Sequence, residues 1–350
     1  MDHFFTDEDL IKAPPVKRAA YSDRTAWIMA EISRLVYERL PAEKPVSALL
    51  QEIRAAVERG DADDALEGLL KAALAREVES DSVVGEVLRK ANFELLESFA
   101  VDGTEALLAR LNPSDDFEGM LVLAFRGTQP SIKDVLTDLR ANLESVPGGG
   151  RAHQGFMAAF GNVKDSIGEA LKEHGGLPVY ITGHSLGGAL ALIATRELGA
   201  DSLGACYTFG GPRIADDQFF EGIKTPVYRV VNAADGVPRV PFGYGFSILL
   251  GLIRLIPVNG TFQVSEWLRR NLLGYTHYGN LVFLSDAPNA PDENGVLFEG
   301  LVVKKSPNIF WRAKIVLRRL LATRGRAAAG DHRMMEYSQK LLAYAKRRNL

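Results

Sequence analysis

The sequence predicts an α/β fold with a mostly parallel central sheet and helices on both of its faces, plus a helical N-terminal elaboration. From residue 178 to residue 232, short apolar runs alternate with helical patterns. This alternation is typical of parallel strands joined by crossover helices. A serine between two glycines, Ser185, lies at one of the strand-to-helix turns. The chain has 350 residues, of which 47% are hydrophobic, so it can bury a large core.

The first 92 residues are predicted to be helical. Apolar residues recur at helical spacing from Asp23 to Leu40, where Ser22 offers an N-cap and Pro41 ends the run. Residues 45–75 carry further patterns rich in Ala, Leu and Glu. We therefore expect a helical elaboration, residues 1–92, packed on the main α/β domain, residues 93–350, as one structural unit.

The elements of the main α/β domain are predicted in chain order. Two strands joined by a turn at Asp102-Gly103 form a hairpin, because Asp-Gly between apolar runs favours a tight turn. The expected elements are strands 93–99, 105–111 and 120–125, helix 155–172, strand 178–182, helix 186–198, and strands 205–209, 227–232 and 281–284.

A nucleophile elbow is predicted at Gly183-His184-Ser185-Leu186-Gly187. An apolar strand leads into this G-x-S-x-G pattern, and an Ala- and Leu-rich helix leads out of it. A serine on so tight a turn needs the small neighbours Gly183 and Gly187. Its hydroxyl then stands at a helix N-terminus, where the backbone N–H of Leu186 can stabilise an oxyanion. The alternative is an ordinary glycine-rich turn.

Other catalytic groups are sought on either side of the elbow. Thr128 follows an apolar strand and a glycine, so it is a candidate for the second oxyanion donor, and a plain surface turn is the alternative. Asp235 follows a β-branched strand and begins a Gly/Pro turn, which makes it the preferred acid over Asp216 and Asp217.

The base must be a histidine that follows the acid, because the α/β-hydrolase fold usually orders its triad Ser, acid, His. His277 and His332 both meet this condition. His332 opens a C-terminal helix and is preferred on spacing, but spacing leaves His277 open. Ser185, Asp235 and His332 then predict an α/β-hydrolase fold and a serine esterase that needs no metal and no organic cofactor.

The ordered motifs resemble the class 3 (fungal-type) lipase family. They run from about residue 93 to residue 337 and comprise Phe125-Arg126-Gly127-Thr128, His153-Gln154-Gly155-Phe156, the elbow, Thr208-Phe209-Gly210-Gly211-Pro212-Arg213, Asn232-Ala233-Ala234-Asp235-Gly236-Val237-Pro238, and His332 with Tyr337. The resemblance implies that His332 is the base and that His153 is structural. It also implies hydrolysis of lipid esters such as acylglycerols, with a phospholipase or a short-chain esterase as the alternative.

Two apolar segments are candidates for contact with substrate. The resemblance implies a lid near residues 131–142, where Ile132, Val135 and Leu136 are apolar among charges. The insertion 242–273, with Phe246 and Leu249, is expected to form an acyl-binding wall or a membrane-contacting cap. A surface helix and a core helix, respectively, are the alternatives. The basic stretch 304–326 is either a lipid-binding helix or a solvated face.

Composition limits the remaining classes. A formal net charge of −3 argues against a nucleic-acid partner. The first residues, MDHFFTDEDL, show no signal-peptide pattern, so a cytoplasmic location is expected, with non-Sec secretion left open. The expected partners are a lipid or small ester and, peripherally, a lipid interface. A lipase-like binding or signalling module without turnover stays as the alternative from another class.

Overall fold

The computed structural model describes residues 4–12, 14–15, 20–38, 83–114, 117–127, 143–198, 204–240, 274–291 and 297–349. The expected helices in residues 45–75 and the insertion 242–273 lie outside these residues. None of the described helices is long and apolar enough to cross a membrane.

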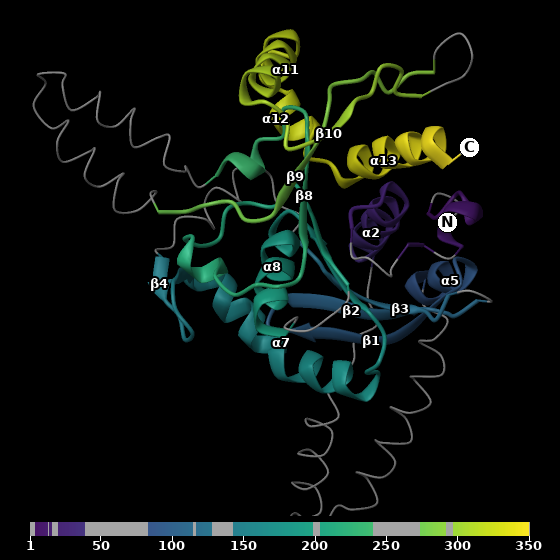
Figure 1. Ribbon diagram of the computed structural model, residues 1–350, viewed down its shortest axis with the longest axis vertical. Helices are drawn as coiled ribbons and strands as arrows, with labels where there is room; N and C mark the ends of the chain where they lie inside the picture. The colour runs from purple at the N-terminus through teal and green to yellow at the C-terminus, as the bar shows by residue number, and fades with distance from the viewer. Residues whose placement is uncertain are drawn as a thin grey trace, which may run out of the picture.

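A mixed sheet forms the centre of the described structure (Figure 1). It has eight strands in the order β1-β2-β3-β6-β7-β8-β9-β10. The inner strands β3, β6, β7, β8 and β9 run parallel to one another, and antiparallel strands complete both edges. The bounds are β1 Phe93–Val101, β2 Thr104–Leu111, β3 Met120–Phe125, β6 Val179–His184, β7 Cys206–Phe209, β8 Val227–Asn232, β9 Asn280–Leu284 and β10 Val303–Lys305.

The α/β-hydrolase fold expected from the sequence is confirmed by this sheet and by the helices on its two faces (Figure 1). The hairpin turn lies where it was predicted: Val101 pairs with Thr104, and Asp102 and Gly103 both have positive φ. Two positive φ values identify a type I′ turn, whose twist suits a two-residue hairpin. The short strands β4 (Leu143–Ser145), β5 (Arg151–His153) and β10 were not predicted, because three residues carry too little pattern.

Two helical layers cover the sheet. One face carries α7 (Gln154–Glu173) and α8 (Leu186–Leu198), which bury an apolar cluster around Phe160 and Ile193. The opposite face carries α2 (Asp23–Leu35), α5 (Val83–Lys90) and α13 (Met334–Asn349). Figure 1 shows α2, α5 and α13 together on one side of the sheet. The remaining elements are α1 (Glu8–Ile11), η1 (Gln218–Phe220), η2 (Val237–Arg239), α11 (Ile309–Ala322) and α12 (Ala327–Gly330).

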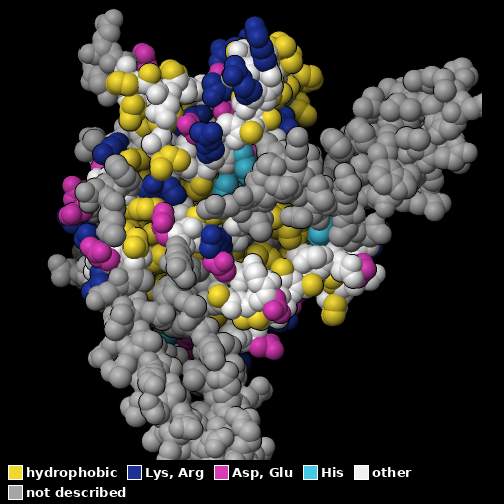
Figure 2. All heavy atoms as spheres, turned by 180° about the vertical axis from the view of Figure 1, so that it is seen from behind, with side chains coloured by type: hydrophobic (Ala, Val, Ile, Leu, Met, Phe, Trp, Pro, Cys, Tyr) yellow, Lys and Arg dark blue, Asp and Glu magenta, His cyan; other side chains and the backbone are white. Residues whose placement is uncertain are grey.

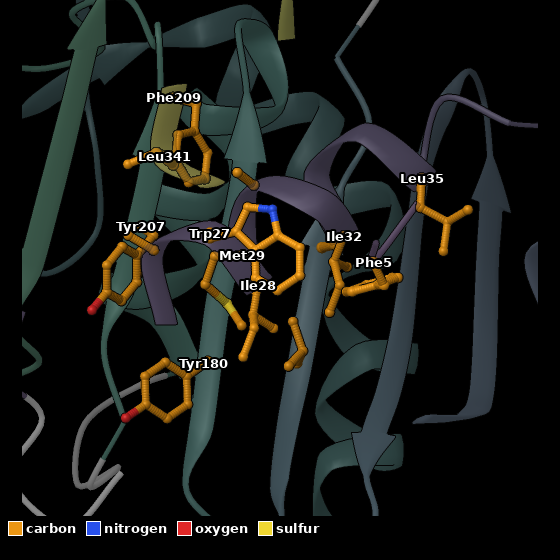
Figure 3. Packing of buried hydrophobic residues seen from close by; sticks show 14 of the residues in the cluster. Phe5, Trp27, Ile28, Met29, Ile32, Leu35, Tyr180, Tyr207, Phe209 and Leu341 are labelled. Carbon is orange, nitrogen blue, oxygen red and sulfur yellow. The ribbon is translucent and has the colours of Figure 1, made fainter. Parts of the chain in front are cut away.

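Helix α2 lies between the sheet and α13. Trp27, Ile28 and Met29 are fully buried, and Figure 3 shows them packed among Tyr207, Phe209 and Leu341 from the sheet and α13. The helix was expected to continue to Leu40, but it ends at Leu35. A tightened turn follows, in which the Tyr37 N–H donates to the Arg34 carbonyl three residues earlier. This turn brings Tyr37 to the carboxyl end of β6, where its hydroxyl meets His184.

Polar contacts also bind α2 to distant parts of the chain. The buried Glu31 accepts hydrogen bonds from the Phe5 N–H (2.7 Å), from Arg34 (2.8 Å) and from Ser338. The hydroxyls of Ser33 and Thr182 lie 2.8 Å apart. Since buried polar groups are costly unless paired, these bonds fix α2 in one position on the sheet.

Candidate active site

The nucleophile elbow is a strained turn between β6 and α8. Ser185 has φ +57°, a left-handed conformation that costs a non-glycine residue about 1–2 kcal/mol. A Cβ on Gly183 would lie 2.2 Å from the Gly187 carbonyl oxygen, and a Cβ on Gly187 would lie 2.3 Å from the Phe125 carbonyl oxygen. Both positions therefore require glycine. Leu186 begins α8, so its N–H has no carbonyl partner within the helix.

Ser185, His332 and Asp235 form a continuous hydrogen-bonded chain. The Nε2 atom of His332 lies 2.9 Å from the Ser185 hydroxyl oxygen. The Nδ1 atom lies 3.0 Å from each carboxylate oxygen of Asp235. Asp235 follows β8 and is fully buried, whereas His332 lies in the turn before α13. This arrangement can remove the serine proton and stabilise the imidazolium that results.

Three rivals came from the sequence: Asp217 is exposed, and His277 and Asp216 have other partners. His277 Nε2 lies 2.6 Å from the Pro238 carbonyl oxygen, which can only accept, so the nitrogen donates. Burial, followed by the charges of Arg229 and Arg213, holds the pKa of His277 well below 6.5. Asp216 accepts hydrogen bonds from Arg151 and from the backbone of the following loop. Burial alone would raise the pKa of Asp216, but these hydrogen bonds lower it.

A second hydrogen-bonded chain supports the base from behind the elbow. His184 Nε2 lies 2.7 Å from the His332 carbonyl oxygen and must donate to it. Burial, and then the nearby imidazole of His332, hold the pKa of His184 well below 6.5, so His184 is neutral. Its Nδ1 atom therefore accepts from the Tyr37 hydroxyl at 2.9 Å. A Cβ on Gly127 would lie 2.4 Å from the same hydroxyl oxygen, so Tyr37 packs between the turn before Thr128 and the loop of His332.

The acid is held by groups that cluster around Gly210 and Tyr337. Asp235 accepts hydrogen bonds from the Tyr337 hydroxyl at 2.5 Å and from the Val237 N–H at 2.9 Å. Gly210 has φ +59°, and a Cβ there would lie 2.6 Å from Asp235 Oδ2 and 3.0 Å from His332 Nδ1. Glycine at this position leaves room for the acid and the base to meet.

The residue before the base anchors the base loop. Asp331 is buried, and its Oδ2 atom accepts a hydrogen bond from the Ala234 N–H at 2.9 Å. Its backbone carbonyl accepts one from Asn232. On its other side, Asp331 pairs with Arg319 of α11 at 2.9 Å. The loops that carry the acid and the base are thus tied directly to each other.

A pocket of about 470 Å³ opens beside the elbow. Its lining includes the apolar side chains of Phe156, Leu186 and Leu190. Arg126 and Glu105, which form an ion pair at 2.5 Å, add a polar wall. Pockets of this size commonly hold small organic ligands.

Several of the predicted site residues cannot be located. The candidate oxyanion donor, the lid candidates and the candidates in the insertion lie outside the described residues. They are, in that order, Thr128; Ile132, Val135 and Leu136; and Phe246 and Leu249. Among described residues, Gly127 lies against the elbow, because a Cβ on it would be 2.6 Å from the His184 carbonyl oxygen. The turn before Thr128 is therefore close to Ser185.

One group among the described residues has the composition of a metal site. Glu97, Glu173 and His174 place one potential ligand atom each within 4.8 Å of one another. They belong to β1 and to the end of α7, and Glu173 is exposed. None of the three belongs to the Ser185 site, and exposed acidic groups often gather without a metal.

Sequence comparison connects this geometry to a known family. Residues 122–245 match the family model for lipase (class 3). This segment is similar to the class 3 lipases. The match covers the elbow and Asp235, whereas His332 lies beyond it. The motifs quoted from the sequence therefore identified the family correctly.

Several known lipases are similar to this chain over part of its length. A lipase of Rhizomucor miehei is 34% identical over 159 residues, which cover 41% of this chain and 42% of that protein. A secreted mono- and diacylglycerol lipase of Fusarium solani is 30% identical over 181 residues, covering 48% and 54%. Lipase II from Rhizopus niveus, a solved structure, superposes with a TM-score of 0.45 at 21% identity, covering 66% and 77%. The chain thus spans about half the length of the relatives that it matches by sequence.

The expected cytoplasmic location is wrong. Relatives such as the Fusarium solani enzyme are named secreted lipases, which points to an extracellular location. The expectation depended on the absence of a signal-like pattern in the first residues. An absence of this kind says little about where a protein works, and here the named relatives contradict it.

Proposed function

We propose that this protein is a serine hydrolase of carboxylic esters, a lipase that cleaves acylglycerol-type lipids through an acyl-enzyme intermediate. The observation that carries the proposal is the position of His332, 2.9 Å from the Ser185 hydroxyl and 3.0 Å from both Asp235 oxygens. Similarity to the class 3 lipases supports an ester as the substrate.

In the acylation step, the Ser185 hydroxyl oxygen attacks the ester carbonyl carbon and its proton passes to His332 Nε2. Asp235 keeps the Nδ1 proton in place and stabilises the imidazolium. The tetrahedral intermediate then collapses, His332 gives the proton to the leaving alkoxide, and an alcohol departs. A water molecule, activated by His332 in the same way, releases the carboxylic acid from Ser185.

The oxyanion of the intermediate needs donors that already point at it. We assign one of them to the Leu186 N–H, which stands at the start of α8 next to Ser185. We assign the second to Thr128, and the position of Gly127 against the elbow supports this assignment. Each such donor typically contributes about 3–4 kcal/mol to the stabilisation of the transition state.

The acyl chain is assigned to the pocket of about 470 Å³ beside the elbow. Phe156, Leu186 and Leu190 supply its apolar surface, and Leu186 adjoins the nucleophile. An apolar pocket next to a nucleophile favours esters whose acyl chain can leave water, because each buried CH₂ contributes roughly 0.8 kcal/mol.

Hydrolysis of p-nitrophenyl esters from short to long acyl chains tests the proposal. We expect kcat/KM to rise with chain length and to fall roughly 10⁴-fold or more in Ser185→Ala. The exposed Ser145→Ala serves as the matched control and should keep full activity. An organophosphonate should label Ser185 in the parent protein and in Ser145→Ala, and it should not label Ser185→Ala.

The other outcomes separate the alternatives. Activity confined to short chains would indicate a general esterase and would overturn the acylglycerol assignment. If neither soluble nor emulsified esters are cleaved, and the phosphonate labels nothing, the protein is a non-catalytic binding module.

A further inference from the structure

We propose that the outer face of α11 is a docking surface for an anionic lipid membrane. Helix α11, Ile309–Ala322, lies outside the segment that matches the class 3 lipase model, residues 122–245. In Figure 1 it stands out at one end of the molecule, beside α12 and beyond the strands β8 and β9.

The outer face of α11 leaves large apolar side chains in solvent. Phe310 is 80% exposed, Leu317 is 59% exposed and Leu321 is 70% exposed. These residues stand at i, i+7 and i+11, so they form one stripe along the helix. Single exposed apolar residues are common on protein surfaces, but a stripe of them marks an interaction site.

Positive charge surrounds this stripe. Residues 304–326 carry eight Lys and Arg residues and no Asp or Glu, in a chain whose formal net charge is −3. Lys314 lies within the stripe at i+4 from Phe310, and Arg324 and Arg326 follow the end of the helix. Figure 2 shows dark blue Lys and Arg side chains beside yellow hydrophobic ones at the end of the molecule where Figure 1 places α11.

The opposite face of α11 is firmly attached to the fold. Val316 is buried against Val231 and Phe283, and the Trp311 ring meets Phe283 edge to face at 5.9 Å. Arg319 pairs with Asp331 at 2.9 Å and with Asp286 at 3.1 Å. Because the inner face is already packed, the apolar stripe on the outer face is not explained by the core.

An anionic membrane is the occupant that fits this surface. A helix of 14 residues is about 21 Å long, shorter than the roughly 30 Å hydrocarbon layer, so it suits a position in the plane of the interface. Phe and Leu enter the headgroup boundary, while Lys and Arg meet anionic headgroups on either side.

Docking at α11 would set the orientation of the active site. The chain runs from α11 through α12 directly to Asp331 and His332. The Arg319–Asp331 ion pair adds a side-chain link between the docking helix and the loop of the base. A membrane held at α11 therefore lies on the side of the protein that carries His332.

Vesicle flotation with full-length Ser185→Ala protein tests the proposal without any lipolysis, so its result is independent of the proposed catalytic function. We expect binding to vesicles of phosphatidylcholine with phosphatidylserine, much weaker binding to phosphatidylcholine alone, and a loss of binding as salt increases. Equal binding to both vesicles, or to neither, would overturn the proposal.

Two sets of variants locate the surface. We expect Phe310→Ser with Leu317→Ser and Leu321→Ser to reduce vesicle binding on the order of a hundredfold. Lys314→Glu with Arg324→Glu should reduce it by about thirtyfold or more, since each basic residue contributes about 1 kcal/mol near an anionic surface.

The matched controls carry the same changes elsewhere. Val83→Ser with Leu297→Ser removes exposed apolar side chains, and Lys90→Glu with Lys172→Glu reverses exposed charges. These controls should bind vesicles as the parent does. When the same changes are made in protein that retains Ser185, all variants should keep activity on a soluble short-chain ester. Parent-like binding by the α11 variants would overturn the proposal. A change in oligomeric state in the α11 variants, without a change in vesicle binding, would instead assign the stripe to a protein contact.

Discussion

Replacing Tyr37 with phenylalanine removes a single hydroxyl that lies behind the elbow. This hydroxyl donates to His184 Nδ1 at 2.9 Å, and His184 in turn donates to the His332 carbonyl at 2.7 Å. Without the hydroxyl, the buried Nδ1 atom has lost its donor. The tautomer of His184 with its proton on Nε2 is then less favoured over the other tautomer. The hydrogen bond from Nε2 to the His332 carbonyl is weakened as a result.

The expected cost follows from this loss. An ordinary hydrogen bond contributes about 1 kcal/mol to stability, and a buried group left unpaired costs about 1–3 kcal/mol. We expect Tyr37→Phe to lower the free energy of unfolding by about 1–3 kcal/mol. A loss of roughly 1 kcal/mol in positioning slows a reaction about fivefold, and a misplacement of 1 Å slows it about a hundredfold. We therefore expect kcat to fall by a factor between these limits.

The assay is steady-state hydrolysis of a soluble ester together with denaturant unfolding. KM should change little, because Tyr37 does not line the pocket beside the elbow. Tyr278→Phe is the matched control: its hydroxyl donates to the Ile223 carbonyl at 3.1 Å, away from the triad. The control should lose stability and keep kcat. The reasoning is refuted if Tyr37→Phe keeps the parental kcat while losing as much stability as the control.

Two further changes probe the acid and the buried histidines. Gly210→Ala places a methyl group 2.6 Å from Asp235 Oδ2 and should lower kcat about a hundredfold. The control Gly222→Ala, with φ +88° and open space around it, should lose stability only. Equal kcat values in the two variants would contradict this reasoning. Because burial holds the pKa of His184 and of His277 well below 6.5, the unfolded chain binds protons that the folded chain does not. The free energy of unfolding should therefore be full above pH 6.5 and decrease below it, by up to about 1.4 kcal/mol per pH unit for each histidine. In urea unfolding between pH 5 and 8, His277→Gln should show a smaller pH dependence of stability than the parent protein.

The fold was predictable where the pattern is local and long. The hairpin at Asp102-Gly103 and the alternation from β6 to β8 follow from turn chemistry and apolar runs, and both are present. The three-residue strands β4, β5 and β10 could not be predicted, because their pairing depends on neighbours that are distant in the chain.

Part of the candidate site could be predicted from the sequence, again because its motifs are local. Ser185 and Asp235 stand in motifs whose neighbours explain them, and the structure brings both to one place. Spacing left the base open between His277 and His332. The structure distinguishes them through their partners, since His277 donates to a carbonyl whereas His332 contacts Ser185 and Asp235.

Tyr37 carried no signal that sequence reasoning could use. It follows a helix interpreted as an elaboration, and its partner His184 lies 147 residues further along the chain. Gly210 offered a weak signal, as a glycine in a motif shared with the class 3 lipases. Only the positions of Asp235 and His332 around it show why a side chain at that position is excluded.

The packing of α13 on α2 has a consequence for biosynthesis. His332 is made 147 residues after Ser185, and Ser338 must reach back across 307 residues to meet Glu31. Contacts so far apart form late, since the intervening chain must first be ordered. We therefore expect the emerging polypeptide to carry a finished elbow with no working base. On the proposed function, ester hydrolysis would therefore begin only once α13 has docked.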